Sequence, residues 1–232
     1  MTADIIATND QKRAAAWAAV EEVRSGMRVG LGTGSTAAHA VRRLGDRVRE
    51  GLRIQAVATS LATENLAQAM GIPVLDFGDI DVIDLAIDGA DEIDDRLFAI
   101  KGAGGAMLRE KVVAAAARRM IVIADASKRS AAIGRAPVPV EVLPFAQTFV
   151  RAQLERLGAQ TALRLTDGEP FRTDQANLIV DCDFAALPDP AGIAARIAEI
   201  PGALGHGLFL IEVDTAYIGG ENGVTRLDRP AG

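Results

Sequence analysis

The sequence predicts an α/β fold with a doubly wound, mostly parallel, Rossmann-like sheet and a smaller α+β domain of the ferredoxin-like kind. Three observations lead to this prediction. Apolar strand-like runs alternate with helical patterns over the first ~130 residues, and glycine-rich turns follow several of these strands. Prolines at 137, 139 and 144 then separate this block from one with a different order of elements. The 232 residues, 49% hydrophobic and 24% charged, suffice for one large domain or two unequal ones.

The first block contains alternating helix and strand patterns. Apolar residues at helical spacing, a Ser or Thr before the third helix, and short β-branched runs that end in glycine define them. In order we expect a helix over 10–25, a strand over 27–32, a helix over 35–50, a strand over 53–58, a helix from Thr59 or Ser60, strand-like runs within 73–77 and 81–94, a helix over 104–119 and a strand over 120–125.

The second block, after the prolines, reads as helix, strand, strand and helix over 147–157, 161–165, 177–184 and 190–199. This order suits a ferredoxin-like α+β unit. The runs 207–214 and 216–224 either close that unit or return to the first sheet. The periodicity leaves both options open.

Composition and charge exclude several functional classes. The net charge is −6 and aromatic residues make up only 4%, so neither a general nucleic-acid interface nor a base-stacking platform is expected. A local basic pocket for a small anion remains compatible with this balance. The single cysteine, Cys182, rules out an internal disulfide framework and a cysteine-based zinc cage, and it is predicted to be a buried apolar residue. No signal core or membrane span is recognisable, which predicts a cytoplasmic protein without membrane contact.

The first motif, GLGTGSTAAHA over 30–40, lies between a predicted strand and a helix. Glycines allow a ligand to approach the backbone, and a helix N-terminus with hydroxyls at Ser35 and Thr36 favours an anion. The motif differs from a dinucleotide fingerprint because Ser35 takes the place of the third glycine, and it lacks the lysine of a Walker A loop. A purely structural tight turn is the alternative.

The second motif, DLAIDGADEID over 84–94, follows a strand into a glycine turn. Asp88 ends the strand, and several carboxylates follow it where open α/β sheets bind ligands. Clustered carboxylates raise each other's pKa, which suits proton transfer or capture of sugar hydroxyls. The alternatives are a solvated acidic loop and a Mg²⁺ site.

The third and fourth motifs, KGAGGAMLREK over 101–111 and ADASK over 124–128, contain lysines beside turns. Lys101 can stabilise a developing oxyanion and Glu110 can act as a general base. An exposed helix face and a capped turn are the alternatives. Lysine occurs only at 12, 101, 111 and 128, whereas arginine supplies the other 21 of the 25 basic residues, which favours a specific need for ammonium groups.

The two histidines carry no recognisable chemistry. His39 lies in the helix after the glycine loop and is predicted to be a packed or capping residue, and His206 stands alone. There is no Ser-His-Asp set, no HExxH motif and no cysteine–histidine cluster, so metal catalysis and acyl transfer have little support.

Taken together, GLGTGSTAAH, ATS (58–60), IDGADEID, KGAGGAMLREK, DASK and PVEVLP resemble the type A ribose-5-phosphate isomerase family in order and spacing, from about Gln11 to Val224. The resemblance implies metal-free, cofactor-free interconversion of ribose 5-phosphate and ribulose 5-phosphate in the pentose phosphate pathway, by a homodimer or homotetramer. It also implies a large domain of residues 1–133 and 210–232 with a small domain, 134–209, inserted. The departures are Ala103, where many members have glycine, and the stretch DTAYIGGENGV.

The resemblance implies that Glu110 is the proton-transferring base. Combined with the reading from the residues, it makes Lys101 the electrophile for a cis-enediolate and Asp88 a second acid or base. The substrate contacts that it implies are Thr33, Gly34, Ser35, Thr36, Asp88, Gly89, Ala90, Asp91, Lys101, Gly102, Ala103, Gly104 and Lys128, with Lys12 as a further contact to the phosphate.

Three alternatives of other kinds stay open from the sequence. One is a non-catalytic sugar-phosphate sensor on the same fold, and the others are a coenzyme A transferase with a glutamate nucleophile and an amino-sugar phosphate deaminase. A nicotinamide-dependent dehydrogenase is disfavoured by the glycine loop, which lacks both the third glycine and the acidic ribose partner.

Overall fold

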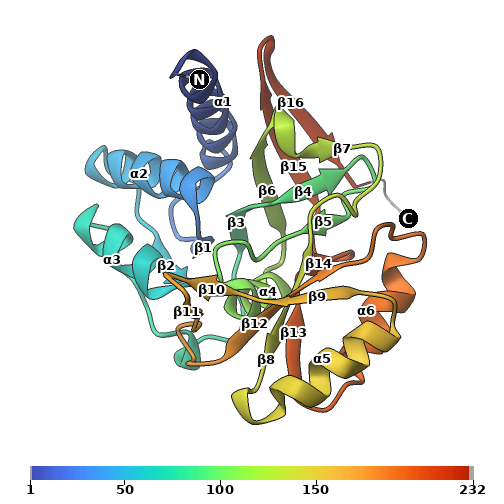
Figure 1. The fold of residues 1–232 in the computed structure, drawn as a ribbon. Helices are drawn as coiled ribbons and strands as arrows, with labels where there is room; N and C mark the ends of the chain where they lie inside the picture. Colours follow the sequence, from blue (N-terminus) through green and yellow to red (C-terminus); the bar gives the residue numbers. More distant parts are fainter. Residues whose placement is uncertain (1, 230–232) are drawn as a thin grey trace.

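A six-stranded sheet forms the centre of the molecule (Figure 1). The computed structural model describes residues 2–229, and the side chains of residue 5 and of 7–229. Five strands are parallel and the sixth pairs antiparallel at one edge. The order across the sheet is β16 (Gly223–Asp228), β15 (Thr215–Gly220), β6 (Met120–Asp125), β3 (Leu85–Gly89), β1 (Arg28–Leu31) and β2 (Gln55–Ala58).

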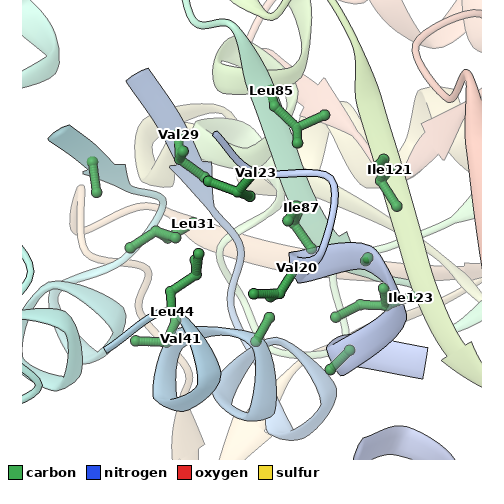
Figure 2. Packing of buried hydrophobic residues seen from close by; sticks show 14 of the residues in the cluster. Val20, Val23, Val29, Leu31, Val41, Leu44, Leu85, Ile87, Ile121 and Ile123 are labelled. Carbon is green, nitrogen blue, oxygen red and sulfur yellow. The ribbon is translucent and has the colours of Figure 1, made fainter. Parts of the chain in front are cut away.

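Helices cover both faces of this sheet, which confirms the predicted α/β class. Ile121 and Ile123 of β6 contribute to one hydrophobic core, whereas Val122 and Ala124 contribute to the other. Alternate residues of a strand point to opposite faces, so both faces are buried. The first core lies under α1 (Thr2–Val20), α2 (Ser35–Arg49) and α3 (Leu61–Ala69), and Figure 2 shows its packing; α4 (Met107–Ala116) covers the second.

A second, antiparallel sheet follows the ferredoxin-like order, strand–helix–strand–strand–helix–strand. Its strand order is β13 (Ala203–His206), β8 (Val138–Val142), β12 (Leu178–Asp183) and β9 (Gln160–Leu163), with α5 (Gln147–Arg156) and α6 (Pro190–Ala198) packed on its core. A short hairpin of β10 (Leu165–Thr166) and β11 (Glu169–Pro170) lies between β9 and β12. Cys182 is fully buried in this core, as predicted.

The segment between the two sheets differs from the prediction. The prolines were expected to mark only a crossover, but Val138–Val142 forms β8, an inner strand. Pro139 is tolerated because its carbonyl faces Gly207, just beyond the end of β13, and accepts the Gly207 amide at 2.7 Å. The N and O of one strand residue point to the same side, so the nitrogen of Pro139 needs no partner strand there.

The C-terminal strands return to the central sheet. Of the predicted run 207–214, only β14 (Leu208–Phe209) is a strand, and it joins a small third sheet. The other members of that sheet are β5 (Ala99–Ile100), β4 (Glu92–Asp94) and β7 (Arg129–Ser130). β15 then pairs with β6 and turns into β16 (Figure 1).

The first helix packs closely against β15. It begins at Thr2 and ends at Val20, earlier than the predicted 10–25 at both ends. Gly219 of β15 lies against the backbone of Gln11, where a Cβ atom would be 2.0 Å from the Gln11 carbonyl oxygen. Only glycine permits this approach. The two far-apart segments are therefore held in direct contact.

The predicted division into 1–133 with 210–232 and 134–209 stays a prediction, and residues 1 and 230–232 lie outside the described part. The strands of the ferredoxin-like sheet all come from 138–206, which supports it. Within 2–229 no helix is both long and apolar enough to cross a membrane.

Candidate active site

A cleft opens where the strand order of the central sheet reverses. The chain proceeds from β1 to β2 on one side and to β3, β6 and β15 on the other. Open α/β sheets bind ligands at this switch point, beyond the carboxyl ends of the strands. The loop after β1 carries the first glycine motif and the turn after β3 carries the acidic motif, so the topology brings the two together.

The cleft has a volume of about 120 Å³. Its lining consists almost entirely of predicted site residues: Lys12, Thr33, Gly34, Ser35, Thr36, Gly89, Ala90, Asp91, Lys101, Gly102, Gly104, Glu110 and Lys128. Two predicted residues do not line it. Asp88 is buried and contacts Lys101, which does line the cleft, and Ala103 lies in the loop between two lining glycines.

One end of the cleft is suited to a phosphate. α2 begins after Gly34, and no side chain caps its first turn, so backbone N–H groups are free to receive an anion. The ammonium group of Lys12, from α1, donates a hydrogen bond to Ser35 Oγ at 3.2 Å. Lys128 follows β6 in a short 3₁₀ turn whose start is capped by the Asp125 carboxylate.

The other end holds three buried charged groups. The Nζ atom of Lys101 lies 2.8 Å from Oδ2 of Asp88 and 3.0 Å from Oε2 of Glu110. The three residues are at most 4% exposed. Lys101 also donates to the carbonyl of Gly89 at 2.5 Å. Asp88 is the next-to-last residue of β3, Lys101 follows β5 and Glu110 lies in the first turn of α4, so three separate elements build the cluster.

Burial perturbs the pKa values of all three groups. Burial, and then the charge of Asp88, raise the pKa of Glu110 to about 8. Burial also raises the pKa of Asp88 in spite of the nearby ammonium. Burial alone lowers the pKa of Lys101, but the Asp88 and Glu110 carboxylates outweigh it and raise that pKa above its usual value. Lys101 therefore stays charged while Glu110 titrates near neutral pH.

Comparison with known proteins agrees with this geometry. The family model described as "Ribose 5-phosphate isomerase A (phosphoriboisomerase A)" matches residues 55–223. A protein of that name from Sphingopyxis alaskensis is 57% identical over 208 residues, which cover 90% of this chain and 91% of that protein. The chain belongs to the ribose-5-phosphate isomerase A family.

Solved structures of ribose-5-phosphate isomerases share the whole fold. The enzyme from Methanocaldococcus jannaschii superposes with a TM-score of 0.90 at 39% identity, covering 94% of this chain and 98% of that one. A D-ribose-5-phosphate isomerase solved with phospho-erythronic acid gives a TM-score of 0.93 at 34% identity, covering 96% and 99%. The chain is thus an aldose–ketose isomerase, and the sensor, transferase and deaminase alternatives are not favoured.

The Asp88 side chain is oriented from its own turn and from the first glycine loop. Its Oδ1 accepts the amide of Gly89 at 2.7 Å and that of Thr33 at 3.1 Å. Its Oδ2 is left for Lys101. In this ribose-5-phosphate isomerase A family member, Asp88 therefore ties the glycine loop after β1 to the buried ammonium group.

Four hydroxyl groups cluster beneath the cleft, and the sequence did not predict that they lie together. The hydroxyl of Thr33 lies 2.8 Å from those of Thr59 and Ser60, and 3.2 Å from that of Thr63. Thr63 in turn donates to the carbonyl of Gly32 at 3.0 Å. Ser60 is the N-cap of α3, as expected. The ATS motif at 58–60 is the only sequence signal for this cluster, which fixes Thr33 from below.

The backbone amides of the loop over 101–105 differ in whether a protein group already accepts a hydrogen bond from them. The Ala103 amide donates to Oδ2 of Asp91 at 2.8 Å and so is engaged. Within residues 2–229, the amides of Gly102 and Gly104 donate to no protein acceptor, and both residues line the cleft. The backbone donors available to a substrate oxygen in this loop are therefore those of Gly102 and Gly104.

The remaining candidates lie away from the cleft. The ammonium group of Lys111 pairs with Glu212 at 3.1 Å and donates to the Leu208 carbonyl, so it is structural. His39 bonds Asn9 at 3.0 Å, which fits the expected packing role. Among the described residues, no group of three His, Cys, Asp or Glu side chains is arranged to hold a metal ion.

Proposed function

We propose that this isomerase interconverts D-ribose 5-phosphate and D-ribulose 5-phosphate through a cis-enediolate, by proton transfers that require no metal. The observation that carries the proposal is the pairing of Glu110 with Lys101, 3.0 Å apart at the closed end of a cleft whose other end suits a phosphate. The relatives named above support the choice of substrate.

In this proposal Glu110 is the general base. Its carboxylate removes the proton from C2 of the open-chain aldehyde, and the electron pair forms the C1–C2 double bond while O1 becomes negative. A pKa of about 8 supports the role, because a base works best when its pKa is close to the operating pH. The same carboxyl group then returns its proton to C1.

Lys101 and Asp88 complete the transfer. The Lys101 ammonium stabilises the charge on O1, together with the free amides of Gly102 and Gly104. Asp88 acts as the second acid or base through Lys101, whose Nζ lies 2.8 Å from its Oδ2: the ammonium gives a proton to O1 and takes the proton of the C2 hydroxyl, so that C2=O forms as C1 takes the proton from Glu110. We also assign to Asp88, acting through Lys101, assistance in opening the furanose ring.

The substrate phosphate is assigned to the first turn of α2, with Ser35, Thr36, Lys12 and Lys128. Free N–H groups and two ammonium groups favour a dianion there. Anchoring the phosphate holds a flexible open-chain sugar in register with Glu110, which lowers the entropic cost of reaction. The other lining residues, Thr33, Gly34, Gly89, Ala90 and Asp91, are assigned to the sugar chain.

The test is proton NMR of ribose 5-phosphate in D₂O with purified, EDTA-treated protein. We expect ribulose 5-phosphate to form, with deuterium entering a carbon-bound position. Absence of ketose would overturn the proposed reaction, and ketose formation lost on EDTA treatment would overturn metal independence. Ketose without deuterium would contradict an enediolate that exchanges with solvent. Glu155→Gln, on exposed α5, is the matched control for Glu110→Gln.

We further propose that the protein acts in the cytoplasm, in the pentose phosphate pathway, as a homodimer or homotetramer. Exposed apolar side chains support association: Phe145 is 96% exposed and Ile211 is 83% exposed. Light scattering after size-exclusion chromatography tests this, and a purely monomeric species at working concentrations would contradict it.

A further inference from the structure

We propose that Arg164, from the ferredoxin-like sheet, is a positioning residue for the isomerisation, because it aims the Gly104 amide into the cleft. The inference rests on the proposed function. Nothing in the sequence around Arg164 marks it, since it lies between β9 and β10 and the two residues that it contacts precede it by 62 and 61 positions. Its role becomes clear only from the contact between the ferredoxin-like sheet and the loop after Lys101.

Arg164 is held firmly on its own sheet. Its Nε donates to Oδ2 of Asp181 at 2.9 Å, and its Nη2 donates to Oδ1 of the same carboxylate, which makes a two-point pair. Its backbone amide donates to the carbonyl of Ile179, and its carbonyl accepts the amide of Phe171, both at 2.9 Å. The side chains of Arg164 and Asp181 are only 16% and 22% exposed. The remaining nitrogen, Nη1, therefore has a fixed position.

That nitrogen binds the loop after Lys101. Nη1 donates to the carbonyl oxygen of Gly102 at 2.7 Å and to that of Ala103 at 3.1 Å. The chain has no cis peptide bonds among its described residues, and in a trans peptide the C=O and the following N–H point in opposite directions. Holding the Ala103 carbonyl therefore turns the Gly104 N–H away from Arg164 and toward the cleft that Gly104 lines.

The neighbouring peptide shows the same geometry with a visible partner. Arg164 holds the Gly102 carbonyl, and the following amide, that of Ala103, points the opposite way and donates to Asp91 at 2.8 Å. The loop is thus hydrogen-bonded on both sides, by Asp91, which follows β3, and by Arg164 of the ferredoxin-like sheet. Gly104, one residue further on, is left with its amide free.

The loop needs this support because its own backbone bonds are few. Gly102 has φ +113° and Gly105 has φ +79°, in the region that favours glycine, and a single turn bond links the Gly105 amide to the Gly102 carbonyl at 3.0 Å. The ring of Phe171, also from the second unit, covers Gly105. Without Arg164, the Ala103–Gly104 peptide is free to rotate, and the Gly104 N–H no longer points toward the enediolate oxygen.

Arg164→Met is the main test, with Arg151→Met as the matched control. Arg151 lies on the same sheet unit and contacts Thr161 rather than the loop. We expect Arg164→Met to lower kcat by about 10- to 100-fold, since a misplaced donor costs on this order, with KM changed less than about 3-fold. Arg151→Met should keep wild-type kinetics.

Ligand binding separates a positioning role from general damage. Inorganic phosphate probes the α2 end alone, whereas phospho-erythronic acid adds a planar carboxylate that resembles the enediolate oxygens. In Arg164→Met we expect binding of phospho-erythronic acid to weaken by about the same factor as kcat, and binding of phosphate to stay unchanged. Equal weakening of both ligands, or an unchanged kcat, would overturn the proposal.

A variant that fails to fold does not end the test. Arg164→Lys keeps the charge and stem, but an ammonium cannot hold Asp181 and both carbonyls at once. We expect an intermediate loss of kcat, and wild-type turnover in Arg164→Lys would also overturn the role. If the wild-type protein itself does not isomerise ribose 5-phosphate, the proposed function fails. If it does and the Arg164 variants are unaffected, only this inference fails.

Discussion

The two ends of the cleft are built on opposite principles. The phosphate end has exposed or half-buried groups, a helix N-terminus and lysines from separate elements, tied by single contacts such as Lys12 to Ser35. The reacting end is almost fully buried, and Lys101 is shared between Asp88 and Glu110. Burial, together with the charge of Asp88, raises the pKa of Glu110 to about 8, so the difference teaches that binding can remain solvated while proton transfer needs a dry site.

Removing the base tests the reacting end most directly. We expect Glu110→Gln to lower kcat by about 10²- to 10⁴-fold, because the amide cannot accept the C2 proton. KM should change little, since the phosphate contacts remain. Steady-state kinetics with ribose 5-phosphate gives both numbers, with Glu155→Gln as control. Turnover near the wild-type value would remove Glu110 from the role of base.

The pH dependence tests whether burial sets the working range. Glu110 must be deprotonated to act as a base, so kcat/KM should fall about 10-fold per unit as the pH drops below about 8. Lys101, whose pKa is raised, stays protonated across this range. Lys128→Ala should show the same midpoint, because the titrating group lies at the other end. A profile with its midpoint near 4.5 would show that burial does not tune Glu110.

Changes at the phosphate end should act on binding instead. We expect Lys128→Ala to raise KM by about 10-fold, the order of magnitude for one charged hydrogen bond, with kcat altered much less. Lys128→Arg should recover part of the affinity. Kinetics at constant ionic strength measures this split. A loss confined to kcat would mean that the two ends are not separate in function.

The free energy of unfolding is the quantity in which we expect the smallest effect. Because the folded-state pKa of Glu110 is raised above its ordinary value of 4.5, its contribution to stability is fully present below that value and is lost as the pH rises through about 8. Glu110→Gln should therefore be closer to the wild type in stability at pH 5 and more stable than the wild type at pH 9. Urea unfolding at both pH values checks this, and a variant less stable at pH 9 would contradict it.

Much of the reacting end was predictable because its residues lie in motifs at strand ends. Asp88, Lys101 and Glu110 each follow or border a glycine turn, and local glycine chemistry leaves a clear pattern. The site residues Thr33 to Thr36 and Lys128 were predictable for the same reason, because they too lie in short motifs that follow strands. What the sequence could not provide is the state of each group, such as the engagement of the Ala103 amide by Asp91.

The second unit was harder to predict for a physical reason. The prolines of β8 hid its strand character in the sequence. A strand tolerates Pro139 here only because β13 ends beside it, and this depends on the whole sheet rather than on the segment itself. β13 itself contains one glycine, has a glycine on each side and shows little apolar alternation. Arg164 and Asp181 were missed because an arginine between two short strands has no local signature, and only packing brings it to a loop 62 residues away.

The contact between Gly219 and Gln11 determines when the phosphate end can form during synthesis. Helix α1, which carries Lys12, rests on a strand that leaves the ribosome about 200 residues later, roughly 10 to 40 s at usual elongation rates. The reacting end also depends on late residues, because the Lys101 amide donates to the Gly207 carbonyl and β5 pairs with β14. A growing chain therefore completes both ends of the cleft only near the end of its synthesis.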